Sequence, residues 1–350
     1  MNFRQEKIIE FLTNEGEAQT QEIQDYLLKI MGEEFSRMTI IRDMEELLNQ
    51  ELVSRKGSGR SAAYEIAAKG RILAPMSDYR DYFQKDPDQR IKNEKTFQES
   101  VFQSIKFLFS QDELEELDKI NDEYRKRITS LTDGTLRKEF ERLTIELSWK
   151  SSRLEGNTYS LVDTEILLTE EKEAEGHKKE EAIMLLNHKK ALEYIYQNRQ
   201  KFQNLTLRNI EDVHSLLTEN LGISKGLRKT LVGITGTAYK PLDNEYQIRE
   251  AMEKMTKNIN SLKHPLGKAL AFILLISYIQ PFEDGNKRTA RITANAILMA
   301  HNYCPLSYRS VDEAEYKKAI LIFYEKNSAW LFKRLFVEQY KFAVKNYFQA

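Results

Sequence analysis

Residues 280–291 read Gln-Pro-Phe-Glu-Asp-Gly-Asn-Lys-Arg-Thr-Ala-Arg, and no other stretch of the chain is as informative. They join an apolar segment to a second helix through an acidic, glycine-containing turn that ends in cations. Backbone N–H groups and the helix dipole favour an anion at such a helix start. Asp284 offers a carboxylate to a magnesium ion. Arg288 and Arg291 lie three residues apart, so both can face one anion. The stretch therefore predicts a polyphosphate site.

The first residue of this stretch is Gln280, at the place where a proton-accepting group is expected. An amide side chain has no proton equilibrium near neutral pH and cannot act as a general base. The stretch therefore predicts a polyphosphate site in which position 280 cannot act as a general base. Sequence alone does not say whether Gln280 is natural or engineered.

The stretch resembles the signature of the Fic (Fic/Doc) family, His-Pro-Phe-x-Asp/Glu-Gly-Asn-Gly/Lys-Arg-x-x-Arg, and Gln280 replaces the family's catalytic histidine. The resemblance implies that Phe282 anchors the loop and that Asp284 holds Mg²⁺ against the phosphates of ATP. It implies an anion site formed by Gly285, Asn286, Lys287, Arg288 and Arg291. Doc-like relatives are kinases, and some members share a lysine at position 287, so transfer of the γ-phosphoryl group remains an alternative.

Residues 151–157, Ser-Ser-Arg-Leu-Glu-Gly-Asn, resemble the family's inhibitory pattern, Ser/Thr-x-x-x-Glu-Gly/Asn. The resemblance implies an inhibitory helix near residues 139–155, with Ser151 and Glu155 as its functional residues. Glu155 is expected to pair with Arg291, the residue that holds the γ-phosphate, and so to force ATP into an unproductive pose. The simpler alternative is an ordinary helix end, because glycine and asparagine are common stop residues.

Composition limits the class of protein. The chain has 350 residues, a formal net charge of −1 and a calculated pI near 6.6, so bulk charge does not predict non-specific nucleic-acid binding. A single cysteine, Cys304, excludes a disulfide framework within one chain. The amino terminus is polar and the longest apolar run, Ala269–Ile279, is too short to span a bilayer. We expect a cytoplasmic protein without a membrane segment.

The pattern along the chain predicts a mainly α fold in three regions. Residues 1–72 are expected to form a winged helix-turn-helix, 73–96 a polar linker, and 97–350 a Fic-type helical bundle with a small β-hairpin flap. In the bundle, the apolar and capping patterns predict helices at 111–130, 136–154, 180–196, 246–262, 265–279, 313–325 and 329–347, and a short helix capped by Asp163.

In the first region, three amphipathic segments precede two strand-like runs joined by a Lys-Gly-Ser-Gly-Arg turn. Thr20 and Ser36 are expected to cap the second and third helices. The stretch 36–43 resembles recognition helices of bacterial transcription regulators, which indicates a bacterial protein. The expected DNA contacts come from this helix and the wing: Arg37, Thr39, Arg42, Arg55, Lys56 and Arg60. Residues 1–71 carry 10 Lys and Arg against 13 Asp and Glu, so a protein-interaction module is an equal alternative.

Residues 230–241 resemble the Fic flap, a hairpin that pairs with an extended segment of the target protein. Val232, Ile234 and Thr235 are the expected target-contacting residues. A purely structural hairpin is the alternative.

These resemblances imply a protein adenylyltransferase that uses Mg²⁺ and ATP, modifies an unknown target protein and is restrained by Glu155. Its activity is in doubt because Gln280 replaces the base. The main alternative is a non-catalytic regulator or interaction protein that senses nucleotide. Removal of AMP from a modified protein is a further alternative. Dimers are frequent in this family, so a homodimer is also compatible with the sequence.

Overall fold

The computed structural model describes residues 1–59, 62–90 and 96–349. The chain divides into two compact units, each assembled from three segments. Unit 1 contains Met1–Leu108, Ile234–Lys240 and Lys318–Lys333; unit 2 contains Phe109–Gly233, Pro241–Lys317 and Arg334–Ala350.

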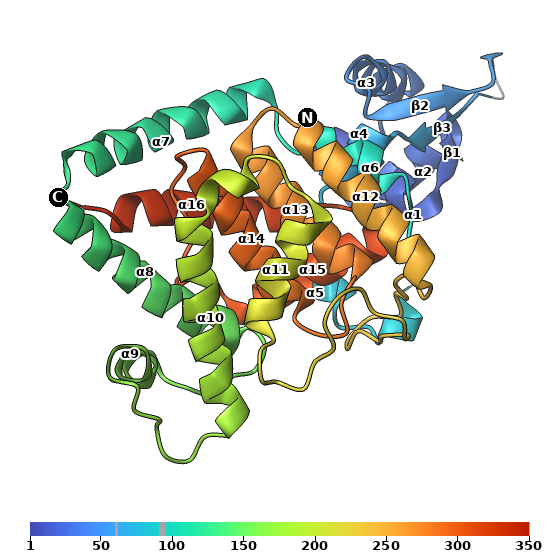
Figure 1. Cartoon of the computed structure of the whole chain (residues 1–350). Helices are drawn as coiled ribbons and strands as arrows, with labels where there is room; N and C mark the ends of the chain where they lie inside the picture. The colour runs from blue at the N-terminus through green and yellow to red at the C-terminus, as the bar shows by residue number, and fades with distance from the viewer. Residues whose placement is uncertain (60–61, 91–95, 350) are drawn as a thin grey trace. The chain divides into compact units, whose positions relative to one another are not determined.

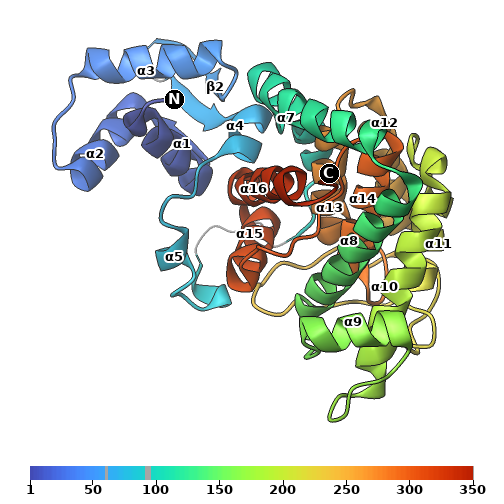
Figure 2. The same ribbon diagram turned by 90° about the vertical axis from the view of Figure 1, so that its left-hand side faces the viewer.

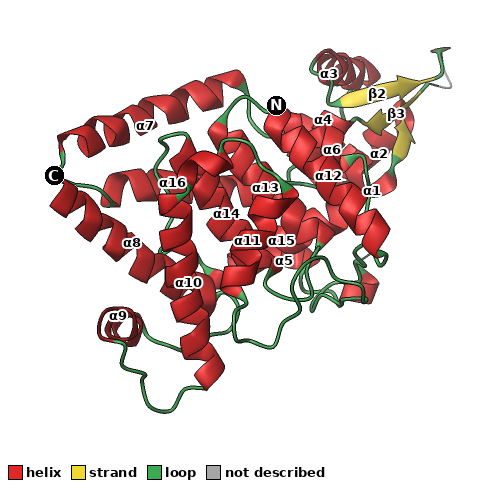
Figure 3. Ribbon diagram, viewed as in Figure 1, coloured by secondary structure: helices red, strands yellow, loops and turns green. Residues whose placement is uncertain are grey.

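Unit 1 begins with three helices and a three-stranded antiparallel sheet, drawn in yellow in Figure 3. Its elements are α1 (Phe3–Glu15), β1 (Glu17–Gln19), α2 (Thr20–Met31), α3 (Arg37–Asn49), β2 (Val53–Lys56), β3 (Ala63–Ile66), α4 (Ala68–Leu73), α5 (Tyr79–Tyr82) and α6 (Val101–Ser104). The strand order is β1-β3-β2, with Tyr64 opposite both Ala18 and Arg55. The helices and the β2–β3 pair follow the predicted order; β1 was not predicted.

The core of this part is apolar and closed. Ile8, Ile23, Ile40 and Met44 are fully buried because each lies on the inner face of its amphipathic helix. Ser36 accepts a hydrogen bond from the Thr39 N–H and caps α3 as predicted. The predicted cap of α2 was wrong by one residue: Gln19, not Thr20, precedes the first turn.

Unit 2 is helical. Its helices are α7 (Gln111–Ser130), α8 (Asp133–Arg153), α9 (Leu161–Glu170), α10 (Lys179–Gln197), α11 (Leu207–Leu217), α12 (Glu245–Ser261), α13 (Pro265–Ile279) and α14 (Asn286–Ala300). Two further helices, α15 (Glu313–Lys326) and α16 (Trp330–Asn346), contribute residues to both units. The structure thus confirms the mainly α fold class.

Helices α13 and α14 lie side by side at the centre of unit 2, where α8, α10 and α11 pack around α14 and α12 packs on α13 (Figures 1 and 2). Every residue from Ala269 to Ile279 is buried, as the continuous apolar run predicts. Pro265 occupies the first turn, where its missing N–H costs nothing. Within the described residues no helix is long and apolar enough to cross a bilayer.

Helix boundaries agree closely with the sequence patterns. α7 and α13 have the predicted limits, and α8 begins three residues earlier than predicted because Thr132 caps it. The short helix α9 is capped by Ser160 and not by Asp163, so this prediction was wrong. The part of the predicted linker that the structure describes is also partly helical. It contains α5, and Arg90 is buried in an ion pair with Glu325, both in unit 1.

The predicted hairpin at residues 230–241 is wrong. The segment is an extended loop with a turn at residues 235–236, and within the described residues its one bridge joins Lys240 to Thr96. The Arg228 guanidinium donates hydrogen bonds to the carbonyl oxygens of Thr230 and Leu242, at the two ends of this loop. In the part of the chain that the structure describes, these carbonyls therefore bond a side chain and not a neighbouring strand. A two-stranded hairpin without other support is only marginally stable.

Candidate functional site

The loop between α13 and α14 is shaped by two residues in the left-handed conformation. Gln280 ends α13 with φ of 51°, and Gly285 precedes α14 with φ of 80°. A Cβ at Gly285 would lie 3.1 Å from the Thr218 methyl carbon, so both backbone angle and space favour glycine there. The sharp turn places residues 281–285 together above the start of α14.

Phe282 anchors the loop, as the sequence predicts. Its ring is fully buried and stacks on the His214 imidazole, with ring centroids 3.8 Å apart. The Asn286 side chain accepts from the Phe282 N–H and donates to the Phe282 carbonyl, at 2.9 and 2.8 Å. The Asn286 amide therefore braces the loop with its oxygen and one of its two N–H groups. His214 Nε2 donates to the Asp284 carbonyl at 2.9 Å, a contact that sequence reasoning missed.

Asp284 and Arg288 form an ion pair at the mouth of the loop, with 3.1 Å between Asp284 Oδ2 and Arg288 Nη2. The Asp284 side chain is 68% exposed, whereas Arg288 is buried and also donates to the Leu217 carbonyl. The described residues include no group of three His, Cys, Asp or Glu side chains able to hold a metal. A magnesium ion at Asp284 would therefore take most of its ligands from phosphate and water, as this ion commonly does.

Arg291 is the buried centre of the site. Its Nη2 donates to Glu155 Oε1 and to the Ser151 carbonyl, each at 2.8 Å, and its Nε donates to Ser151 Oγ at 2.9 Å. Its Nη1 is buried and has no hydrogen-bond partner among the described residues. Because buried donors are nearly always paired, this N–H suits an additional acceptor such as a phosphate oxygen.

Glu155 lies just beyond the end of α8, in the turn that Gly156 continues with φ of 95°. Lys287 approaches its second oxygen at 3.8 Å, so the carboxylate lies between two cations. Burial alone would raise the pKa of Glu155, but the attraction of Arg291 and Lys287 outweighs it, and the pKa is lowered. Glu155 is therefore ionised in this arrangement. The structure brings Ser151, Glu155, Lys287 and Arg291 together as the resemblance implies.

His188 on α10 supports this cluster from behind. Its Nδ1 donates to the Met184 carbonyl at 2.8 Å, so its Nε2 accepts from the Ser151 hydroxyl at 3.0 Å. Ser151 Oγ in turn accepts from Arg291 Nε. This chain fixes the neutral imidazole in one tautomer. No short motif marks His188; its buried position on an amphipathic helix was the only available signal.

Arg228 is a second residue that sequence reasoning missed. Its side chain is buried, and the guanidinium Nε donates to the Gln280 carbonyl at 2.6 Å. The backbone N–H of Arg228 donates to the Pro281 carbonyl at 3.0 Å. With its bonds to Thr230 and Leu242, it ties the two ends of the predicted flap to the start of the motif. The Gln280 side chain itself turns back and donates to the Ser277 carbonyl at 2.6 Å.

Comparison with known proteins agrees with this geometry. The model of the Fic/DOC family matches residues 204–298, which include the motif loop, Arg228 and Arg291. Residues 204–298 are a Fic/DOC domain. Ser151, Glu155 and His188 lie outside the matched range and reach the domain through the packing of α8 and α10 against α14.

Curated relatives that match more than half of this chain include animal proteins named protein adenylyltransferase Fic. One from Nematostella vectensis is 29% identical over 211 residues, which are 58% of this chain and 48% of the relative. One from Drosophila melanogaster is 24% identical over 188 residues, 53% of this chain and 38% of the relative. The chain thus spans about half or less of the curated relatives it matches. These animal relatives do not support the bacterial origin predicted from residues 36–43.

Solved structures show the same fold at low sequence identity. Fic-1 from C. elegans (aa134 - 508) has a TM-score of 0.58 and 18% identity, covering 70% of this chain and 79% of that chain. A Fic domain containing signaling protein from Bacteroides thetaiotaomicron has a TM-score of 0.54 and 22% identity, covering 65% and 92%. The Fic fold therefore extends well beyond the matched Fic/DOC domain.

The predicted flap residues are only partly buried. Val232 belongs to unit 2 and is half-buried, whereas Ile234 and Thr235 belong to unit 1, with Thr235 exposed. None of the three lies in a strand. Target contact by these residues remains a prediction for the Fic/DOC domain.

The residues predicted to contact DNA differ in their exposure and in their present bonding partners. Lys56 is paired with Glu65 at 2.6 Å and Glu17 at 3.2 Å, and the Thr39 hydroxyl bonds Ser36. Arg42 is exposed on α3. Arg60 lies outside the described residues. Arg37 and Arg55 line a pocket. DNA contact by this set remains a prediction.

We expect His188 to make the stability of unit 2 dependent on pH. Burial, reinforced by the nearby Arg288 and Arg291 charges, lowers its pKa to about 3. Between about pH 6.5 and that value, the unfolded chain binds a proton that the folded chain does not, so stability falls as pH falls. From pH 7 to 5 the His188 contribution is a loss of about 2 kcal/mol in the free energy of unfolding.

Urea unfolding of the wild type and His188→Gln at pH 7 and pH 5 measures this contribution. Glutamine can still accept from the Ser151 hydroxyl but does not titrate. His188→Gln should lose less stability than the wild type between the two pH values. Equal losses in the two proteins would contradict the prediction.

Proposed function

We propose that the chain is a protein adenylyltransferase of the Fic type, which transfers AMP from ATP to a protein hydroxyl and is held inactive by Glu155. The ion pair between Arg291 and Glu155, with 2.8 Å between Nη2 and Oε1, is the observation on which the proposal rests. The relatives named protein adenylyltransferase Fic support the reaction class.

The inhibition of the reaction follows from the same contact between Glu155 and Arg291. A γ-phosphate needs the Arg291 guanidinium, yet Glu155 already occupies one of its N–H groups and adds a negative charge at that point. ATP that enters with Glu155 in place meets repulsion at its terminal phosphate and adopts a displaced pose. Two serine contacts and Lys287 hold the carboxylate and the arginine in place, so release requires movement of the α8 end.

The motif loop supplies the rest of the proposed site. Asp284 would hold Mg²⁺, which neutralises phosphate charge when it is bound. The backbone N–H groups of Gly285, Asn286 and Lys287 lie at the start of α14, where the helix dipole favours the phosphates. Arg288 is fixed by Asp284 and the Leu217 carbonyl, so it acts mainly as a rigid positive charge beside them.

Gln280 limits the reaction. A target hydroxyl must lose its proton as it attacks the α-phosphate, and an amide cannot take that proton. Loss of a general base typically slows a reaction by about 10²–10⁴-fold. Positioning and charge stabilisation remain, and they provide most of the acceleration in phosphoryl transfer. The native chain is therefore proposed to be a slow transferase.

The leading alternative is a nucleotide sensor without turnover. The bond from the Gln280 side chain to the Ser277 carbonyl favours it, because that bond turns the amide N–H inward. An intact Glu155 contact argues against it, since an inhibitory carboxylate has little use where nothing is catalysed. Lys287 at the position shared with Doc-like kinases keeps phosphotransfer as a further alternative, and AMP removal aligned by Glu155 is another.

Calorimetric titration with Mg·ATP tests the restraint separately from catalysis. We expect Glu155→Gly to bind Mg·ATP at least about tenfold more tightly than the wild type, because it frees Arg291 and removes a repelling charge. Glu173→Gly, in an exposed loop, is the matched control and should match the wild type. Equal affinity in all three proteins would refute autoinhibition by Glu155.

A further inference from the structure

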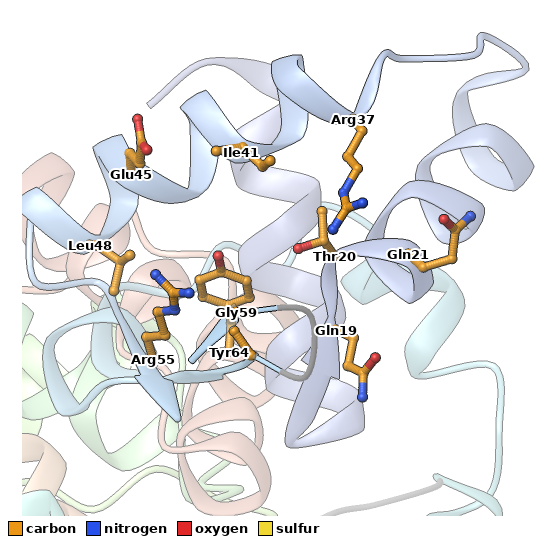
Figure 4. A pocket seen from close by; sticks show the side chains of 11 residues that line it. Gln19, Thr20, Gln21, Arg37, Ile41, Glu45, Leu48, Arg55, Gly59 and Tyr64 are labelled. Atoms are coloured by element: carbon orange, nitrogen blue, oxygen red, sulfur yellow. The ribbon is translucent and has the colours of Figure 1, made fainter. Parts of the chain in front are cut away.

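A pocket of about 330 Å³ opens in unit 1 between α3, the start of α2 and the sheet (Figure 4). This volume lies at the lower end of the range for small-molecule sites. The pocket draws residues from each of these elements and from the ends of the β2–β3 loop: Gln19, Thr20, Gln21, Arg37, Ile41, Glu45, Leu48, Arg55, Gly59, Ala62 and Tyr64. No part of the proposed adenylyltransferase site uses them.

Two guanidinium groups define the chemistry of the pocket. Arg37 begins α3 and Arg55 lies on β2; in Figure 4 the Arg37 guanidinium lies next to Thr20, and the Arg55 guanidinium lies on the other side of the Tyr64 ring. Neither arginine forms a hydrogen bond or ion pair with any residue that the structure describes. Two other cations of unit 1 are compensated, because Lys56 pairs with two glutamates and Arg4 with Asp43. The pocket therefore has two uncompensated positive charges.

The floor of the pocket is apolar and rigid. Tyr64 is buried on β3, and its ring faces the pocket, while Ile41 and Leu48 contribute half-buried side chains from one face of α3. A flat or compact apolar group can rest on this floor while an attached anion reaches the arginines. Glu45 on α3 also lines the pocket, and its carboxylate points away from Tyr64 (Figure 4).

Charge over the whole module favours a small ligand over duplex DNA. Residues 1–71 have a net charge of −3, from 10 Lys and Arg against 13 Asp and Glu. Duplex DNA is bound through many phosphate contacts spread over a basic face. Here Arg37 and Arg55 both line one concavity, and Lys56 is already neutralised.

We propose that this pocket binds a small organic anion, with a phosphate or carboxylate group held between Arg37 and Arg55 and a flat apolar body on Tyr64 and Leu48. Charge-assisted hydrogen bonds to guanidinium groups provide the affinity and orient the ligand. Unit 1 would then bind this ligand at a site that is separate from the nucleotide site in unit 2.

Ligand-observed NMR titrations of the full chain test the proposal with phenyl phosphate, benzoate and uncharged phenol. We expect phenyl phosphate or benzoate to bind and phenol to bind at least about tenfold more weakly. Arg37→Gln and Arg55→Gln should each lower the affinity for the anion about tenfold or more. Arg42→Gln is the matched control, because Arg42 is exposed on the same helix but does not line the pocket; it should bind like the wild type.

Comparison of the variants separates this pocket from the phosphate site of unit 2, which all of them retain. Binding that is equal in Arg37→Gln, Arg55→Gln and wild type would place the anion elsewhere and overturn the proposal. So would an absence of binding by both anions. A 20-base-pair DNA duplex that displaces the anion and is weakened as much by Arg42→Gln as by Arg37→Gln would also overturn it in favour of a nucleic-acid face.

Discussion

The double variant Glu155→Gly/Gln280→His is expected to transfer AMP to protein about 10²–10⁴ times faster than Glu155→Gly alone. Glycine at 155 frees Arg291, and histidine at 280 supplies the missing base. The backbone already suits this change, because Gln280 has φ of 51° and histidine is among the residues that tolerate this left-handed region. The imidazole would replace an amide that donates a hydrogen bond to the Ser277 carbonyl.

Incubation with Mg·ATP followed by intact-mass analysis measures this gain, because self-modification adds one AMP to the chain. Glu155→Gly/Gln247→His controls for an added histidine, since Gln247 is exposed on α12. AMP addition by the double variant only would mean that the native chain has the site but lacks the base. Equal rates for Glu155→Gly with and without the new histidine would show that Gln280 does not limit the reaction. No addition by any variant, with retained ATP binding, would support the sensor.

Replacement of Arg291 by methionine is expected to destabilise the protein by about 3 kcal/mol. The Glu155 carboxylate would lose its closest cation, and Ser151 would lose two donors in a site where its hydroxyl is fully buried. The cost stays at the low end of the usual range because the Glu155 side chain is 20% exposed and Lys287 remains at 3.8 Å.

Urea unfolding at pH 7 followed by circular dichroism measures the loss. Arg208→Met is the matched control, because the Arg208 side chain is 85% exposed, and it should change stability by less than about 0.5 kcal/mol. Glu155→Gln/Arg291→Met should recover part of the loss by removing the unpaired charge. If Arg291→Met were as stable as Arg208→Met, the buried ion pair would not stabilise the folded state.

Several features of the site depend on distant parts of the chain and could not be read from local sequence. His188 and Arg228 belong to no short motif, yet they hold Ser151 and the Gln280 backbone through hydrogen bonds across the sequence. Asn286 was expected in the anion cradle, but no sequence pattern indicated that its side chain also bonds both backbone groups of Phe282. Such choices depend on which neighbour lies within about 3 Å, and periodicity carries no such information.

The hairpin predicted at residues 230–241 was wrong for the same reason, because contacts with distant residues decide the structure of this segment. Branched residues and glycines favour a hairpin locally, but Arg228 donates to the Thr230 and Leu242 carbonyls at the two ends of the segment, and among the described residues only Lys240 forms a bridge. In unit 1, β1 was missed because three residues are too few for an alternating pattern; its pairing with β3 fixes it.

The sequence by itself determined the helical class, the limits of helices such as α7 and α13, and the residue types of the polyphosphate loop, because local periodicity, capping and turn chemistry act over a few residues. Only the tertiary structure decided that Glu155 reaches Arg291 across 136 positions of sequence, that His188 lies behind Ser151, and that two arginines predicted for DNA meet at one pocket. Those contacts arise when helices and strands far apart in the chain pack together to bury their apolar faces, and packing selects which polar groups become neighbours.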